Sequence, residues 1–145
     1  MTTKSLSSEE PFLCNLPWLQ EEMKGKSSLE KRNVFIEVTD SLLRNAFLSQ
    51  NKKVIVGSAD YTRNVSLDYR THKHLAVAVL CIQGNPDYIS IFSDDGINIT
   101  EKFSLKDGDF LYLPPFYSHG AESSINPTER TAIACYLLLQ DELVK

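Results

Sequence analysis

The sequence predicts an all-β domain built from short antiparallel strands, and two observations support this fold class. After Lys53 the chain consists of segments rich in β-branched and aromatic residues, such as DYISIF at 87–92 and DFLYLP at 109–114. The segments between them, such as QGNPD and KDGD, are dense in the Gly, Pro, Asn and Asp that turns require. Strands that recur about every ten residues, with no helical period between them, are typical of a β-sandwich or β-barrel.

Two of the expected strands are apolar on both faces, LAVAVLCI at 75–82 and TAIACYLLL at 131–139. A strand without a polar face needs cover on both sides, so we expect these two at the centre of a sheet. The remaining expected strands are KVIVG at 53–57, NVSLDYR at 64–70 and INITEKFSL at 97–105.

The N-terminal part of the chain predicts a short helical segment. Residues Pro17 to Met23 fit a helix, because proline is tolerated in a first helical turn and Gly25 can end it. The stretch TDSLLRNAFLSQNKK allows two interpretations. Thr39 or Asp40 could cap a helix there, or the same residues could form a strand.

The composition indicates one globular domain of ordinary type. The chain has 145 residues, of which 42% are hydrophobic and 23% are charged. We expect residues 1–30 to form an extension that packs on a barrel, and residues 31–145 to form that single barrel.

Charge and cysteine usage exclude several classes of function. The net charge is −4, and basic residues come in pairs such as Lys52-Lys53, so this chain alone presents no nucleic-acid groove. No apolar stretch is long enough to span a bilayer. The 3 cysteines are an odd number without a C-x-x-C pair, which favours reduced thiols and a cytoplasmic protein.

The 3 histidines of the chain form the pattern that points to chemistry. His72 and His74 are two residues apart, so in a strand they project to the same side. His119 follows a strand and the Pro114-Pro115 turn, which would hold it rigidly. Three neutral imidazoles can bind Zn²⁺, Fe²⁺, Mn²⁺, Ni²⁺ or Cu²⁺ and leave positions open for water or substrate.

Two segments carry a family resemblance. RTHKHLAVAVLCIQG resembles the first cupin motif, and GDFLYLPPFYSHGAESSIN resembles the second, so that the likeness covers about residues 53–139. The resemblance implies a double-stranded β-helix, the cupin jelly-roll barrel, with a short N-terminal helical segment added here. It also implies that His72, His74 and His119 are metal ligands. Cupins commonly pair through sheet edges, so we expect a homodimer in which the N-terminal segment could add a strand to a neighbour.

The first motif departs from the family pattern at one position. Val77 and Ala78 stand where the family usually has a glutamate ligand, and no carboxylate occurs from Leu75 to Asn85. Glu122 could replace it only if the chain bends inward. The ligand-sensing barrels of AraC-type regulators show a similar departure, and many of them bind a small molecule without a metal.

Several other residues are candidates for a substrate pocket. Asp68 and Arg70 share the strand parity of the paired histidines and could line the barrel mouth, or form solvent-facing salt bridges. Tyr112 lies on one face of its strand, and either face could meet a ligand. Phe116 and Tyr117 could form the rim, or cover a barrel end.

These patterns predict a small cytoplasmic cupin that binds a divalent transition metal (Zn, Fe, Mn or Ni) and acts on or binds a small organic molecule. As an enzyme it would be dioxygenase-like or isomerase-like, because no general base is visible apart from the ligands. The alternative is a metal-free ligand-binding barrel similar to the AraC-type regulatory domains.

Overall fold

The computed structural model describes residues 7–63, 75–83, 87–92, 98–115, 117–123 and 131–141. They form two helices and eight strands: β1 (Phe12–Asn15), α1 (Pro17–Met23), α2 (Ser28–Leu48), β2 (Lys52–Arg63), β3 (Ala76–Gln83), β4 (Asp87–Phe92), β5 (Ile99–Leu105), β6 (Asp109–Leu113), β7 (Ser118–Ser123) and β8 (Thr131–Asp141).

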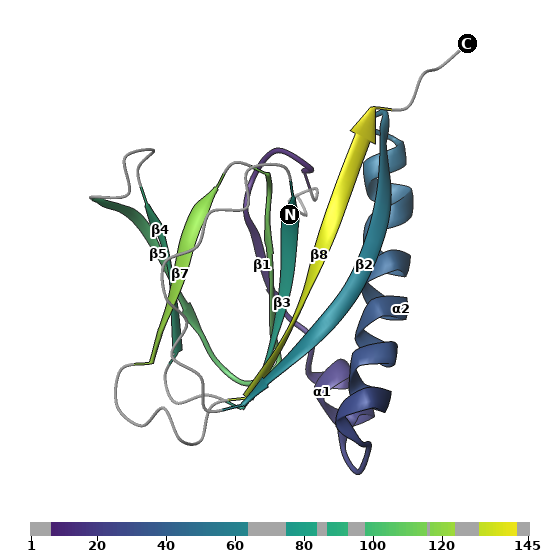
Figure 1. Ribbon diagram of the computed structural model, residues 1–145, viewed down its shortest axis with the longest axis vertical. Coiled ribbons are helices and arrows are strands. Elements are labelled where there is room, and N and C mark those ends of the chain that lie inside the picture. Colours follow the sequence, from purple (N-terminus) through teal and green to yellow (C-terminus); the bar gives the residue numbers. More distant parts are fainter. Residues whose placement is uncertain are drawn as a thin grey trace, which may run out of the picture.

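The described strands form two antiparallel sheets that face each other. One sheet has the order β1-β6-β3-β8-β2, and the other has the order β5-β4-β7. The chain passes from the larger sheet to the smaller after β3, returns at β6, and crosses twice more at β7 and β8. This path is that of a jelly roll. Figure 1 shows the two layers, with α2 against the outer face of the larger sheet. The predicted all-β jelly roll with a short N-terminal helical segment is therefore confirmed.

The two strands expected at the centre of a sheet are there. In the larger sheet β3 pairs with β6 and β8, and β8 pairs with β3 and β2. Every residue of β3 from Ala76 to Cys81 is buried, because one face of the strand packs under α2 and the other packs between the sheets. Ala76, Ala78 and Leu80 belong to the first cluster, and Val77, Val79 and Cys81 belong to the second.

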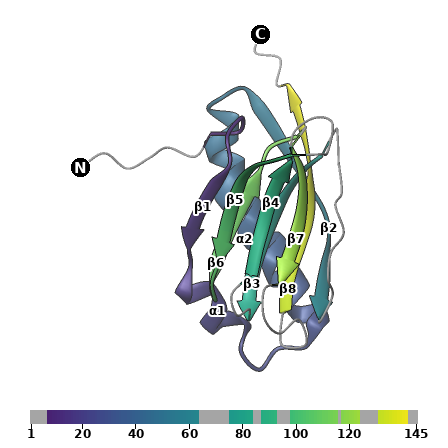
Figure 2. The same ribbon diagram turned by 90° about the vertical axis from the view of Figure 1, so that its left-hand side faces the viewer.

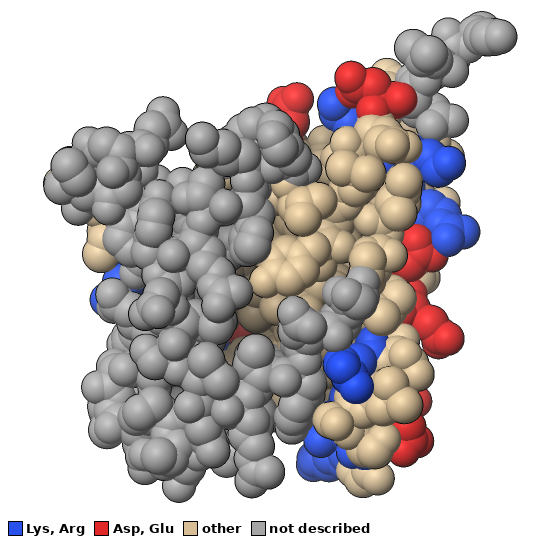
Figure 3. Space-filling model, in the orientation of Figure 1, with Lys and Arg blue, Asp and Glu red and all other residues tan. Residues whose placement is uncertain are grey.

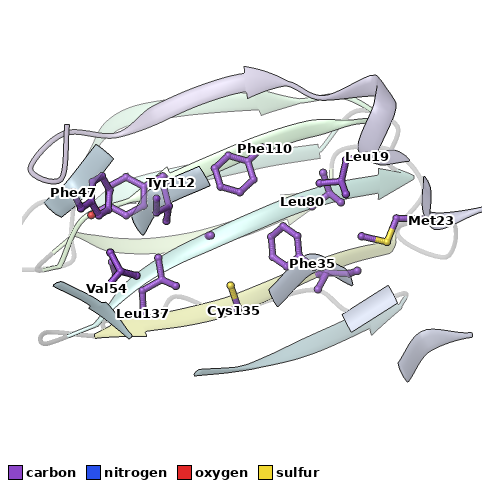
Figure 4. Close-up of a cluster of buried hydrophobic side chains, with 14 residues drawn as sticks. Leu19, Met23, Phe35, Phe47, Val54, Leu80, Phe110, Tyr112, Cys135 and Leu137 are labelled. Atoms are coloured by element: carbon purple, nitrogen blue, oxygen red, sulfur yellow. The ribbon is translucent and has the colours of Figure 1, made fainter. Parts of the chain in front are cut away.

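The cluster under α2 is the larger of the two (Figure 4). Phe35 of α2 meets Phe110 of β6 edge-on, with ring centroids 6.1 Å apart. Phe47, three helical turns further along, meets Tyr112 in the same way at 5.0 Å. All four side chains are buried, so α2 is part of the core and not an appendage.

Helix α1 is confirmed over the predicted residues, whereas α2 begins earlier than expected. Its N-cap is Ser27, whose side chain accepts a hydrogen bond from the Glu30 backbone N–H while the Glu30 carboxylate accepts one from the Ser27 backbone N–H. The cap expected at Thr39 or Asp40 is wrong, because Thr39 is buried in the middle of the helix. The Ser-x-x-Glu pattern of a capping box was present in the sequence at this point.

Two strands of the structure were not expected from the sequence. β1 pairs with β6, so this part of the N-terminal segment adds a strand to its own sheet. β7, of sequence SHGAES, has no β-branched or large apolar residue, and it forms because β4 supplies a regular pairing partner. The boundary expected near residue 30 lies within the first turn of α2.

Candidate functional site

The candidate site lies at the end of the barrel where β6 ends and β3 begins. Val77 pairs with Leu113, and Ala76 pairs with Leu137, so the start of β3 lies beside the last residue of β6. Pro114 is buried and follows directly. Leu75, the first described residue of one histidine motif, and Pro114 of the other motif lie at this end of the molecule.

His119 lies on β7, and its pairing places it in the fold. Its Cα is opposite that of Ile91 on β4, in a register that runs without interruption from Ser118 to Ser123. Ile91 is buried in the cluster between the sheets. Directly opposed residues of an antiparallel pair share a face, so position 119 belongs to the inner face of the smaller sheet. Position 122 pairs with Tyr88 and belongs to the opposite face.

Seven site residues were predicted besides His119, and five of them lie outside the described part of the chain. These five are His72, His74, Asp68, Arg70 and Phe116. Tyr117 is described: it is half-buried and packs against the cluster between the sheets. The structure thus brings Tyr117 and the backbone of His119 to the same end of the barrel.

Tyr112 occupies the outer side of the larger sheet. It is buried under α2, and its hydroxyl donates a hydrogen bond of 2.8 Å to the backbone carbonyl of Ser8. Burial raises the pKa of Tyr112 well above its usual value, so the phenol stays protonated. On the same strand, Leu111 and Leu113 face the space between the sheets.

The position of the missing glutamate is also visible. Val77 is buried in the cluster between the sheets, whereas Ala78 packs under α2. Of these two positions, only Val77 faces the interior where a ligand carboxylate would act. Within the described residues, no group of three or more His, Cys, Asp or Glu side chains could hold a metal ion.

Two cavities open at this end of the molecule, on either side of the N-terminal segment that leads into β1. One has a volume of about 460 Å³ and is lined by Ser8, Glu9, Lys52, Pro114, Pro115, Leu138 and Leu139. The other has a volume of about 510 Å³ and is lined by Glu10, Pro11, Phe12, Leu13, Glu101, Phe103 and Tyr117. Sequence reasoning missed the residues from Ser8 to Pro11, because a polar N-terminus carries no periodic signal.

The amine that lines the first cavity is engaged in an ion pair. Lys52 forms an ion pair with Asp141 across the β2–β8 ladder. The Lys52 ammonium donates a hydrogen bond to the Asp141 carboxylate, which raises the pKa of Lys52, so this amine stays protonated. Ser8 is held by its backbone N–H, which donates a hydrogen bond of 2.8 Å to Gln50 Oε1. The N-terminal segment is therefore fixed at the barrel end by contacts with both the sheet and the residue that follows α2.

The thiols do not offer reactive groups. Burial raises the pKa of Cys135 to about 11. Burial and the neighbouring Asp109 carboxylate raise the pKa of Cys14. A thiol that is protonated at neutral pH is a poor nucleophile.

Comparisons with known proteins place the fold. No family model matches the sequence, and no curated protein matches it. The structure of acireductone dioxygenase from Bacillus anthracis, with a cadmium ion in its active centre, is similar to this chain at 14% identity, with a TM-score of 0.52 over 93% of this chain and 81% of that one. A likeness at this identity is one of fold, and acireductone dioxygenase is a cupin-fold protein. The chain therefore has the cupin fold.

Two further solved structures resemble parts of the chain. A variant of oxalate decarboxylase from B. subtilis matches at 17% identity and a TM-score of 0.41, over 69% of this chain and 24% of the decarboxylase. A structural-genomics target from E. coli strain K12 matches at 14% identity and a TM-score of 0.47, over 61% of this chain and 92% of its own. No helix in the described part of the chain has the length and apolar character needed to cross a membrane.

Proposed function

We propose that the protein is a small cupin that binds a divalent transition metal (Zn, Fe, Mn or Ni) through His72, His74 and His119, and acts on or binds a small organic molecule. The observation that supports this proposal most is the β4–β7 register, which assigns position 119 to the inner face opposite the buried Ile91. The proposal also draws on the cupin fold, because β3 begins directly after the His72–His74 segment at the same barrel end.

The bound metal would supply Lewis-acid polarisation of a carbonyl or hydroxyl, or activation of dioxygen, as in a dioxygenase-like or isomerase-like cupin. The residues of the chain would provide the surroundings. Val77, Leu113 and Ile91 make the inner cluster apolar, which keeps water away from that side of the site. Tyr117 lies two residues before His119 and packs on the same cluster, so it is placed to orient a ligand.

Three further residues belong to the same proposal. Asp68, Arg70 and Phe116 are proposed pocket residues because of their places in the two motifs. Tyr112 is not included, because its ring and hydroxyl are engaged under α2 and with Ser8.

One observation favours a second candidate function. Val77 packs in the inner cluster at a position where a cupin commonly has its glutamate ligand. An apolar side chain at this position suits a barrel that binds an organic ligand without a metal, as in the AraC-type regulatory domains. The two functions differ in whether the purified protein retains a metal.

Elemental analysis of protein purified without added metal tests the proposal. We expect about one equivalent of a transition metal per chain. His72→Ala and His119→Ala should each lose that metal while their circular dichroism stays that of the folded protein. Glu37→Gln, a change at an exposed position of α2, is the matched control and should keep the metal.

A different outcome would support the second function. If the protein holds less than about a tenth of an equivalent, and soaking with Zn²⁺, Fe²⁺, Mn²⁺ or Ni²⁺ does not change this, the metal proposal is wrong. In that case, thermal stabilisation by small organic ligands in the absence of metal would identify the barrel as a binding module.

A further inference from the structure

The cavity of about 510 Å³ lies where the sandwich is open at one side, between the edge strands of the two sheets. β1 is the end strand of the larger sheet and β5 is the end strand of the smaller one. In Figure 2 the two strands run along the same side of the molecule. We propose that this cavity binds a small organic cation, namely a protonated amine attached to an apolar body.

Part of the cavity wall is apolar, and the core holds that part in place. Phe103 and Tyr117 both pack against the cluster between the sheets, and Phe12 packs against the cluster under α2. Leu13, which is 39% exposed, adds an aliphatic surface on β1. Aromatic rings that the core holds in place can bind the apolar part of a ligand, and their faces attract a cation. The volume suits a small molecule.

Among the described residues that line this cavity, the two charged ones are carboxylates. Glu10 lies just before β1, Glu101 lies on β5, and both are exposed. The ion pairs Lys24–Glu21, Arg44–Asp40 and Lys52–Asp141 involve neither Glu10 nor Glu101. A cationic ligand would therefore find two carboxylates that no described lysine or arginine neutralises.

The neighbouring cavity shows the contrast. Its lining includes Glu9 and Lys52, one charge of each sign, and Lys52 is already paired with Asp141. These two opposite charges offset each other. The charged residues at the cavity between β1 and β5 therefore favour a cationic ligand. Those at the neighbouring cavity favour neither a cation nor an anion.

The two proposals have different readouts, metal content for one and amine affinity for the other, and the described residues that line this cavity include no histidine. The two proposals can therefore fail separately. His119→Ala should lose the metal and still bind the cation, and a protein found to contain no metal should bind it equally well.

Isothermal titration calorimetry of the full chain tests the inference with three probes of similar shape: phenethylammonium, phenethyl alcohol and phenylacetate. We expect phenethylammonium to bind about tenfold more tightly than the neutral alcohol, and the anion to bind most weakly. Raising the salt concentration should weaken binding of the cation alone. Equal affinity for the cation and the anion, or no saturable binding of the cation, would overturn the proposal.

Variants locate the binding to this cavity. Glu10→Gln combined with Glu101→Gln should weaken phenethylammonium binding about tenfold. Glu22→Gln combined with Glu37→Gln removes the same charge from exposed positions on the helices and should leave the affinity unchanged. Leu13→Lys places an amine of the chain itself at the cavity and should abolish binding. Full affinity in the Glu10/Glu101 variant would overturn the proposal, provided that circular dichroism shows the fold intact.

Discussion

The two faces of the five-stranded sheet are covered in different ways. The outer face meets α2, and there Phe35, Phe47 and Tyr112 are completely buried. On the inner face, the cross-strand pair Ile55 and Leu138 remains 41% and 37% exposed at the end near the cavities. The outer face is therefore covered by α2, whereas the inner face leaves apolar side chains partly exposed near the candidate site.

The distribution of charged residues on the surface of the molecule differs in a corresponding way. Along the margin where α2 lies, Figure 3 shows Lys and Arg interspersed with Asp and Glu, which is typical of a solvated helix surface. The area over β2 and β8 next to it is largely uncharged. An apolar inner face that is only partly covered is what a barrel needs in order to admit a ligand. The comparison suggests that stability comes mainly from the helix side and function from the inner side.

The largest effect expected from this comparison is on stability. Phe47→Ala removes a fully buried ring from the helix side and should lower the free energy of unfolding by about 3–5 kcal/mol. Leu138→Ala on the inner face should cost less than about 1 kcal/mol, since Leu138 is partly exposed. Urea denaturation of both variants measures the difference. Similar losses in the two variants would mean that the faces contribute equally and would break the comparison.

The second effect is a pH dependence that arises on the helix side. Cys135 lies in the cluster under α2, and burial raises its pKa from 9.0 to about 11. Above pH 9 the unfolded chain loses the thiol proton while the folded chain keeps it. The unfolded state then binds fewer protons, so stability falls as the pH rises from 9 to 11.

The measurement is the free energy of unfolding of wild type and Cys135→Ala across that range. The wild type should lose about 2–3 kcal/mol more than the variant between pH 9 and 11. Parallel curves for the two proteins would show that the thiol is not protected by the helix.

The sequence predicted the elements whose signal is local or strong. The central strands β3 and β8 followed from their unbroken apolar composition, and α1 followed from Pro17 and Gly25. The full length of α2 could not be predicted from the sequence. Exposed Leu29, Leu42 and Leu48 interrupt its polar face and obscure the helical period. The capping box that begins at Ser27 was the remaining sequence pattern that marked the start of α2.

The candidate site could be predicted only in part, because alternation identifies two faces of a strand but not which one is inside. In DFLYLP the sequence could not say whether Tyr112 or Leu111 met the interior, since α2 had not been recognised as a cover. Similarly, β7 has no β-strand composition, and its pairing with β4 depends on residues distant in sequence. The register that assigns His119 to a face is a property of the sheet and not of the motif.

The smallest expected effect on stability is that of a substitution at Tyr112. It distinguishes the helix side of the five-stranded sheet from its inner side. Tyr112→Phe keeps the ring under α2 and removes only the hydroxyl that donates to the Ser8 carbonyl. Because that carbonyl would lose its buried partner, we expect a loss of about 1 kcal/mol and faster amide exchange at Ser8. Metal content should not change, since the ring faces away from the inner cluster. If Tyr112 instead contacts a ligand, the variant would keep its stability and lose ligand affinity. That result would mean that the helix side takes part in binding, and the division of labour between the two faces would have to be abandoned.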